Sequence, residues 1–229
     1  MRLNKWLVMA GVAPARRKAD EIILAGRVRL ESGLATLGTQ VEVDTQIWLD
    51  DKFIQTEIKP ADIISYHKRV GEICSHTQQG ESPTIFASLP TKYATYKIVG
   101  RLDKASEGLV VLTNDGAIAQ RLAHPSGGHL KRYRVETTTA VTDADIRDLQ
   151  SGTVLDGIAT KFALMRELSQ AKTGQHHYEV VLGEGRNRQI RRSLELRGYR
   201  ISRLIRQSLG SYELGDLPVR QWRQEASRG

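Results

Sequence analysis

The stretch that most constrains this chain runs through residues 100–116, where a polar turn precedes a continuous apolar run. Residues 109–112 are all apolar and lie between Gly108 and a turn sequence at residues 114–116. This pattern is typical of a strand that is covered on both faces, so it predicts a sheet with a central buried strand. Asp103 lies in the preceding turn, where a carboxylate can be presented without occupying a core position. Spacing alone favours a turn-stabilising aspartate over a catalytic one.

The charge of the chain indicates a polyanionic partner. With 34 lysines and arginines against 26 aspartates and glutamates, the net charge is +8 and the isoelectric point about 9.7. Between Arg186 and Arg206 there are eight arginines and one acid, Glu195. A charge run is often only a solvated face, but here apolar residues alternate with the charges. Arginine favours forked contacts with phosphate, so nucleic acid is the best partner class and its binding should depend steeply on salt.

Several other classes of protein are excluded by composition. No apolar run approaches the roughly 20 residues that a membrane span requires, and the N-terminus has no signal-peptide layout, so we expect a cytoplasmic protein. The single cysteine, Cys74, excludes an intramolecular disulfide and is expected in the core rather than in catalysis. There is no P-loop, no Rossmann glycine pattern and no Cys/His cluster, and the adjacent His176 and His177 would face opposite sides of a strand. We therefore expect neither a metal nor a cofactor.

The pattern along the chain predicts a small N-terminal domain at residues 1–58 and a larger domain at residues 62–229. In the first, helices are expected near residues 3–10 and 14–24, with short strands at 26–30, 41–43 and 47–49. Residues 55–61 read as a linker. In the second, strands are expected near residues 63–67, 72–74, 109–112, 131–136, 162–164, 177–182 and 201–209, with helices near 84–89, 117–123, 142–149 and 187–197. Thr142 and Asp145 form a capping-box-like start for one of these helices.

Two blocks of sequence resemble a known family. Gly100-Arg101-Leu102-Asp103, followed by Gly108-Leu109 and the segment 112–116, is similar to a signature of the RsuA/RluB/RluE/RluF branch of the pseudouridine synthases. The segment Glu-Gly-Arg-Asn-Arg-Gln-Ile-Arg-Arg at 184–192 resembles the second signature of that branch, in the same order. The N-terminal layout resembles the alpha-L RNA-binding domain. The resemblance implies an α+β fold, with a mixed, mostly antiparallel sheet and flanking helices in the catalytic domain.

The sequence departs from that family at two places. Pro14-Ala15 stands where relatives commonly place Ser or Thr before paired arginines, so a side-chain cap is missing there. Arg69 in the segment 68–71 stands where the family usually has proline, which removes a rigid turn.

The resemblance also implies roles for individual residues. Asp103 would be the nucleophile, Tyr133 would stack on uracil and act as general base, and Arg191 would pair with the carboxylate and lower its pKa. Without the family, Tyr133 reads equally well as a core aromatic, and any one arginine of the run as a phosphate contact. Further substrate contacts are expected from Arg101, Lys131, Arg188, Arg192 and Leu204, and N-terminal RNA contacts from Arg16, Arg17, Lys18, Arg27 and Arg29.

The function implied is isomerisation of a specific uridine in ribosomal RNA to pseudouridine, nearest to the RluB-type large-subunit enzymes. The base must leave the RNA stack, which costs a few kcal/mol. The expected partners are ribosomal RNA or precursor particles, and we expect a monomer. The alternative is a non-catalytic RNA-binding or ribosome-assembly factor that has retained the fold.

Overall fold

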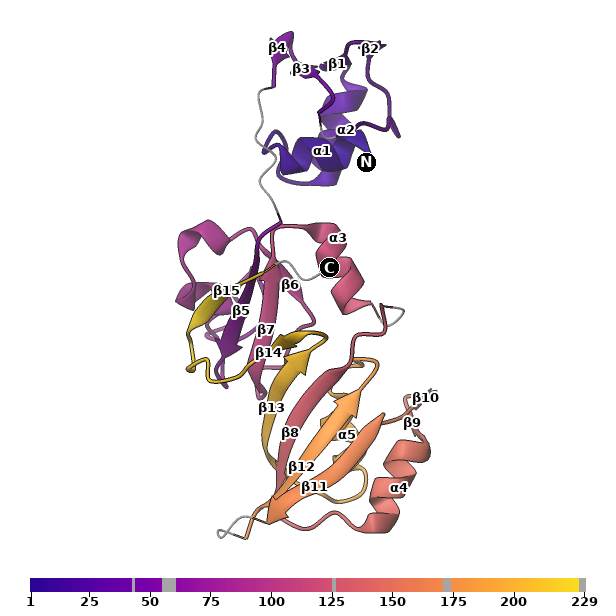
Figure 1. The fold of residues 1–229 in the computed structure, drawn as a ribbon, viewed down its shortest axis with the longest axis vertical. Coiled ribbons are helices and arrows are strands. Elements are labelled where there is room, and N and C mark those ends of the chain that lie inside the picture. Colours follow the sequence, from indigo (N-terminus) through magenta and orange to yellow (C-terminus); the bar gives the residue numbers. More distant parts are fainter. Residues whose placement is uncertain (43, 55–60, 125–126, 171–173, 227–229) are drawn as a thin grey trace. The chain divides into compact units, whose positions relative to one another are not determined.

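The computed structural model describes residues 1–42, 44–54, 61–124, 127–170 and 174–226 (Figure 1). The chain divides into two compact units, Met1–Pro60 and Ala61–Gly229, and each has a hydrophobic core of its own. Apart from Ala61, the linker predicted at 55–61 lies outside the described residues. No helix in the described ranges is long and apolar enough to cross a bilayer.

The N-terminal unit packs two helices against a small sheet. Its elements are α1 (Leu3–Met9), α2 (Arg16–Leu24), β1 (Val28–Leu30), β2 (Gly33–Leu34), β3 (Ile47–Leu49) and β4 (Lys52–Phe53), with strand order β2-β1-β3-β4. The apolar stripe of α1, including Trp6, packs in this core beside Ala19 and Ile23 of α2. Both helices form where the spacing predicts them.

One predicted strand of this unit does not form. At residues 41–43, Val41 and Glu42 lie outside any strand, and residue 43 lies outside the described part of the chain. Val41 is buried and exchanges hydrogen bonds with the backbone of Met1, so the segment is held by the N-terminus and an isolated bridge rather than by a ladder.

The second unit is built on one large mixed sheet. Its strands are β5 (Ile63–Lys68), β6 (Lys97–Val99), β7 (Glu107–Thr113), β8 (Lys131–Thr137), β11 (Leu164–Gln170), β12 (His176–Leu182), β13 (Ile201–Leu209), β14 (Tyr212–Glu213) and β15 (Trp222–Glu225). They run in the order β11-β12-β8-β13-β7-β5-β15, with β14 on β13 and β6 on β7. Only the β13–β7 pair is parallel among the described ladders, which confirms the predicted mixed, mostly antiparallel α+β fold.

The β7 strand is buried on both faces, as its apolar run predicts. Val110 and Leu112 lie in the main core, whereas Leu109 and Val111 lie in a second core beneath α3 (Gly116–Ala123). The Asp115 side chain caps α3 by accepting from two backbone N–H groups of its first turn. A strand fixed from both sides provides a rigid base for the turn that precedes it.

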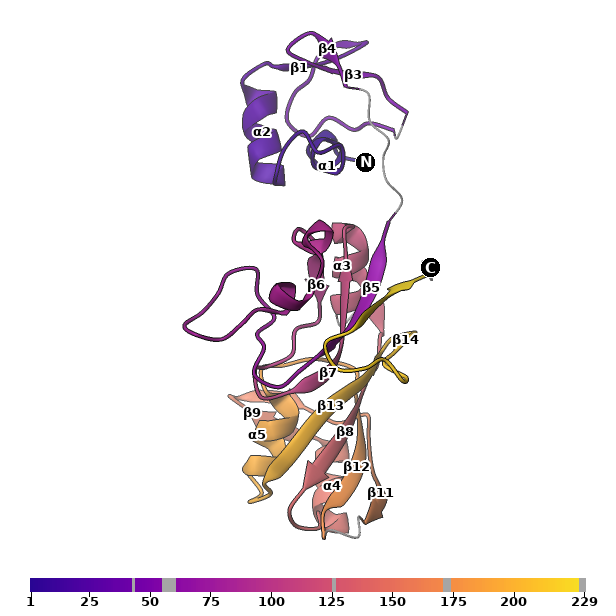
Figure 2. The same ribbon diagram turned by 90° about the vertical axis from the view of Figure 1, so that its left-hand side faces the viewer.

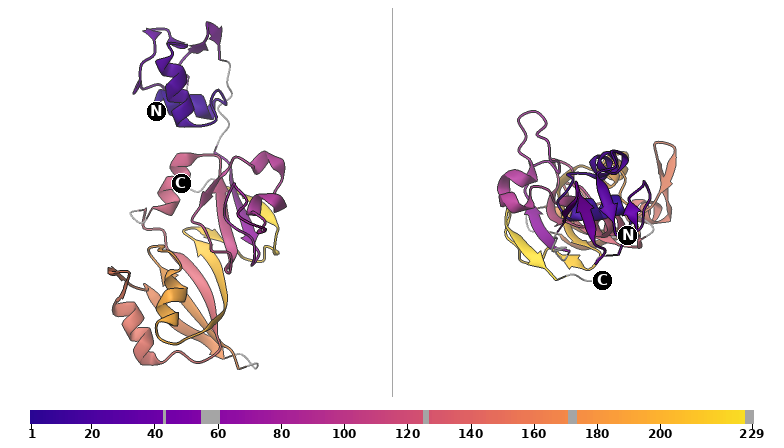
Figure 3. Two further views of the ribbon diagram at one scale, coloured as in Figure 1. Left: turned by 180° about the vertical axis from the view of Figure 1, so that it is seen from behind. Right: turned by 90° about the horizontal axis from the view of Figure 1, so that it is seen from above.

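The other half of the sheet is covered on one face only. Helices α4 (Asp143–Ser151) and α5 (Gln189–Glu195) pack their apolar residues into the main core, on the face seen from behind in Figure 3, and Figure 2 shows α5 beside β13. The opposite face carries alternating arginines and glutamates, as expected for an antiparallel sheet with one solvated side. The predicted cap of α4 is present, because Thr142 Oγ accepts from the Asp145 N–H.

The sequence prediction was wrong in two places here. Residues 72–74 form no strand, since Ile73 makes only an isolated bridge to Thr84, and the helix expected at 84–89 is a single 3₁₀ turn, η1 (Ile85–Ser88). The polar strand β15 and the hairpin of β9 (Thr153–Leu155) and β10 (Ile158–Thr160) were not predicted, because short exposed strands carry little apolar alternation.

Candidate active site

Asp103 lies in the turn that joins β6 to β7 and is partly exposed. The carbonyl oxygen of Asp103 accepts from the Ser106 N–H at 3.0 Å, which closes the turn. The Leu102 N–H donates to the Cys74 sulfur at 3.4 Å, and burial raises the pKa of that thiol. Cys74 is therefore a buried acceptor for the turn, in keeping with the non-catalytic interpretation.

Two buried cations bind the carbonyl oxygens of the last two residues of this turn. Arg191 donates from Nη2 to the carbonyl oxygen of Ala105 at 2.8 Å, and Lys68 donates from Nζ to that of Ser106 at 2.6 Å. Burial lowers the pKa of the Lys68 ammonium. Because the acceptors are backbone groups, both cations fix the path of the chain next to Asp103.

A third buried cation, Arg206, holds both ends of the same segment. Its Nη2 donates to the carbonyl oxygen of Gly100 at 2.5 Å and its Nε to that of Leu109 at 2.7 Å. Arg206 is only 1% exposed. Its alternation with Leu204 on β13 could have placed it on the same strand face from the sequence, but not its role as a support. The acceptors, which are backbone carbonyls about 100 residues away, leave no signal in the sequence.

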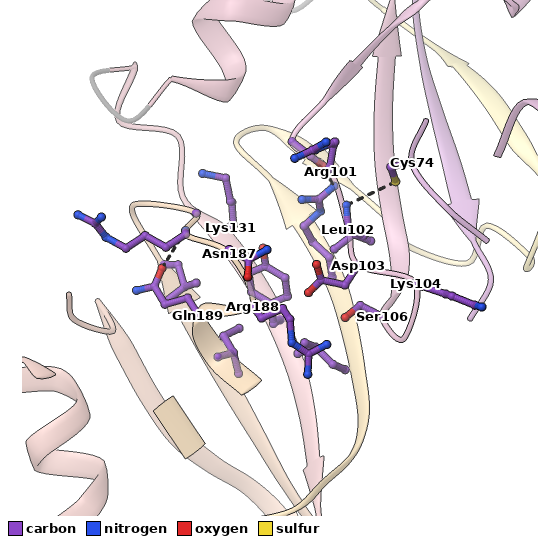
Figure 4. Close-up of a pocket in the computed structure, with 18 of the residues that line it drawn as sticks. Cys74, Arg101, Leu102, Asp103, Lys104, Ser106, Lys131, Asn187, Arg188 and Gln189 are labelled. Carbon is purple, nitrogen blue, oxygen red and sulfur yellow. Dashed lines mark hydrogen bonds between the residues drawn. The ribbon is translucent and has the colours of Figure 1, made fainter. Parts of the chain in front are cut away.

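Asp103 and Arg206 are among the residues that line a cleft of about 520 Å³ within the second unit (Figure 4). Tyr133 of β8 and Leu204 of β13 line it and are almost fully buried, and Asp103 lines the same cleft. Of the predicted substrate contacts, Arg101, Lys131 and Arg188 also line the cleft. Asn187 in the turn before α5 and Gln189 at the start of α5 also line the cleft, and neither was singled out from the sequence.

Arg191 and Arg192 occupy different positions from those expected. No ion pair within 4 Å joins Arg191 to Asp103 in the described structure, and Arg191 Nε is buried there without a hydrogen-bond partner. Burial, and secondarily the charge of Arg188, lowers the pKa of Arg191, whereas the charge of Asp103 raises it. Arg192 instead points to Asp156, with Nη1–Oδ2 and Nη2–Oδ1 distances of 2.7 and 2.5 Å, and is not among the residues that line the cleft.

The predicted N-terminal RNA contacts lie on two elements of the first unit. Arg16, Arg17 and Lys18 are exposed in the first turn of α2, where Lys18 pairs with Glu21 at 2.7 Å. The remaining two lie on or beside β1: the Arg27 fork is occupied by Asp50, and Arg29 stacks over the Trp48 ring at 4.3 Å. Arg16 and Arg17 are thus the more available of the five cations.

The cleft combines a carboxylate on a rigid turn, an aromatic ring and cationic walls. A carboxylate can act as nucleophile or base at a sugar carbon, an aromatic ring can stack on a base, and the cations can bind phosphate. In the described ranges, no group of three or more His, Cys, Asp and Glu side chains is arranged to hold a metal ion. The arrangement therefore suits acid–base and nucleophilic chemistry on a nucleotide.

Comparisons with known proteins agree with this chemistry. A family model described as RNA pseudouridylate synthase matches residues 62–196, and the S4 domain model matches residues 1–47. The chain is 37% identical over 224 residues to ribosomal large subunit pseudouridine synthase B of Escherichia coli (strain K12), a match that covers 95% of this chain and 75% of that protein. The protein of the same name from Haemophilus influenzae is 35% identical over 219 residues, covering 93% of this chain and 61% of that protein.

A solved structure has the same fold. The crystal structure of pseudouridylate synthase superposes with a TM-score of 0.66 at 24% sequence identity, and the match covers 99% of this chain and 96% of that one. At this identity the likeness concerns the fold.

Proposed function

The chain belongs to the RNA pseudouridylate synthase family, and from this premise we propose that it isomerises a specific uridine of large-subunit ribosomal RNA to pseudouridine. The choice of large-subunit RNA is supported by the names of the relatives that match over 95% and 93% of the chain. The net charge of +8 fits an RNA substrate. We also propose that a monomer suffices, because one chain supplies the whole cleft, and that the enzyme works in the cytoplasm, where ribosomes are assembled.

The reaction exchanges one bond at the sugar for another. The bond from C1′ to N1 of uracil breaks, the base turns, and a bond from C1′ to C5 forms while C5 loses its proton and N1 gains one. No electrons are gained or lost overall. The Asp103 carboxylate can either add to C1′ or take the proton from C2′ as the base departs, and both routes need it at the sugar.

The other cleft residues prepare the nucleotide for this step. The Tyr133 ring would stack on the extruded uracil and its hydroxyl would serve as base at the sugar, while Leu204 forms the apolar floor. Arg191 would act through the turn, since it holds the Ala105 carbonyl beside Asp103. Arg16 and Arg17 would add backbone affinity from the first unit.

The observation that carries the proposal is that Asp103, Tyr133 and Leu204 line one cleft although they come from three distant segments. The test is tritium release from ribosomal RNA labelled at C5 of uracil, with naked 23S and 16S RNA and with precursor particles. We expect the wild type to release tritium from 23S RNA or its particles, and Asp103→Asn to release none while it still binds the RNA.

Two results would contradict this proposal. Equal release by both proteins would remove Asp103 from the mechanism. No release by the wild type on any substrate, with RNA binding retained, would favour the non-catalytic RNA-binding or assembly factor, an alternative that gains no support from the named relatives.

A further inference from the structure

Two buried cationic side chains from adjacent strands line the same cleft. Lys131 of β8 is 5% exposed and Arg206 of β13 is 1% exposed, and both line the cleft. Lys131 and Tyr133 share a face of β8 because they alternate along it, and Arg206 is the cross-strand partner of Tyr133. Figure 4 shows Lys131, Asn187 and Asp103 among the side chains that line the cleft.

Within the described chain, neither cation has a carboxylate partner within 4 Å. The acid whose charge acts on Lys131 is Glu184, and that acid is engaged by Arg186 at 3.2 Å. Arg206 donates hydrogen bonds from its Nε and Nη2 to two backbone carbonyl oxygens. The described residues offer no hydrogen-bond acceptor to Lys131 Nζ, so its donors are free to meet a ligand.

This arrangement is costly in the free protein. Burial lowers the pKa of the Lys131 ammonium, and the nearby charge of Arg206 lowers it further. Two like charges withdrawn from water are stabilised when an anion enters beside them, because charge-assisted hydrogen bonds are strong in such surroundings. The uracil and ribose of a target uridine are neutral, so the anions that RNA can bring into the cleft are its phosphodiesters.

We propose that Lys131, backed by the charge of Arg206, binds one of the two phosphodiesters that flank the target uridine. This inference rests on the proposed function, because it takes the extruded nucleotide to enter this cleft. Lys131 Nζ donates to a non-bridging phosphate oxygen, and Arg206 contributes positive charge while it keeps its carbonyl partners. The contact fixes the ribose relative to Asp103, which lines the same cleft.

The test is a double-mutant cycle in which the positive charge is removed from the protein, the negative charge is removed from the RNA, or both are removed. A synthetic RNA hairpin containing the target uridine is made in three forms: natural, with a neutral methylphosphonate 5′ of the uridine, and with one 3′ of it. Wild type and Lys131→Met are compared on each for kcat/KM and for Kd. We expect one methylphosphonate to lower the wild-type kcat/KM about 10- to 100-fold, the usual range for a lost charge-assisted bond, and Lys131→Met to be nearly indifferent to it.

Three controls separate this role from a structural one. Lys131→Arg keeps the charge and should keep the sensitivity to the methylphosphonate. Lys97→Met removes an exposed lysine from β6 and should behave as the wild type on all three RNAs. Thermal unfolding of Lys131→Met checks that the variant is folded.

One outcome would overturn the inference. The losses from Lys131→Met and from each methylphosphonate would multiply independently, so that Lys131→Met would lose the same factor in kcat/KM on all three RNAs, as it would if Lys131 bound a uracil carbonyl. Coupling in Kd without any pseudouridine formation would keep the phosphate site and refute the proposed function instead.

Discussion

Asp103 lies in a turn whose backbone carbonyls are held by three side-chain cations that come from different parts of the chain. Arg206 binds the carbonyl oxygens at both ends of the segment, those of Gly100 and Leu109. Between these ends, Arg191 binds the carbonyl oxygen of Ala105 and Lys68 binds that of Ser106. Each donor is buried, so each hydrogen bond is shielded from water. At the scale of single residues, the position of one carboxylate is therefore determined by arginines and a lysine that need not touch it.

This arrangement gives Arg191 a role that differs from phosphate binding. We predict that Arg191→Ala lowers kcat at least about 10-fold, because the turn carrying Asp103 loses a support and small displacements of a reacting group are costly. The Kd for RNA should change less than about threefold. Single-turnover kinetics and filter binding measure the two quantities.

The neighbouring arginine provides a matched control for that prediction. Arg192→Ala removes an arginine that pairs with Asp156 and does not line the cleft, so its kcat should stay near the wild-type value. If Arg191→Ala lost affinity and turnover in parallel, Arg191 would be assigned to phosphate binding.

At the scale of elements, the site depends on the parallel contact between β7 and β13. Gly108 lies opposite Arg206 in this pairing, with φ +105°. A Cβ added at Gly108 would lie 2.4 Å from the Arg206 carbonyl oxygen, which no backbone contact can accommodate. The glycine thus lets the strand that carries Arg206 approach the turn that Arg206 holds.

We predict that Gly108→Ala lowers the free energy of unfolding by about 2 kcal/mol or more, since both the positive φ and the backbone contact oppose a side chain. Urea denaturation measures the change. Gly183→Ala is the control, because its added Cβ would meet only a Leu130 side-chain carbon at 3.8 Å, and it should cost far less. Equal, small losses for both variants would show that the strand contact adapts.

Some of these elements could be predicted from the sequence and others could not. The strand at 109–112 and the helices α1 to α5 follow strong periodic patterns, so their positions could be predicted. The strand β15 could not, because its sequence Trp-Arg-Gln-Glu is polar and pairs only at the edge with β5. The segment 72–74 has the composition of a strand, yet Cys74 serves as an acceptor for the Asp103 turn.

For the cleft, the family resemblance indicated which residues contribute to it but not which backbone contacts hold them there. Asp103, Tyr133 and Leu204 come together because β7, β8 and β13 are neighbours, and their roles remain predictions. Arg206 and Lys68 could not be identified as supports, because a carbonyl acceptor leaves no trace in the sequence. The eight arginines from 186 to 206 look alike in sequence, whereas in the structure only Arg191 and Arg206 of these eight are buried.

At the scale of the whole molecule, the chain consists of two units, each with its own hydrophobic core. The residues that line the cleft all belong to the second unit, and the exposed Arg16 and Arg17 belong to the first. Chemistry and additional RNA affinity are thus assigned to separate units of one chain. We propose that the cleft of the second unit receives an extruded uridine with the sugar at Asp103.

The most direct measurement is a crystal structure of the enzyme with the ribosomal RNA hairpin carrying 5-fluorouridine at the target position. Fluorine replaces the C5 hydrogen that the reaction must lose, so the nucleotide should be trapped in the cleft. We predict the uracil ring on Tyr133, the sugar C1′ or C2′ at the Asp103 carboxylate and a flanking phosphate at Lys131. A nucleotide that stays stacked in the RNA, or one bound with its sugar remote from Asp103, would contradict the account.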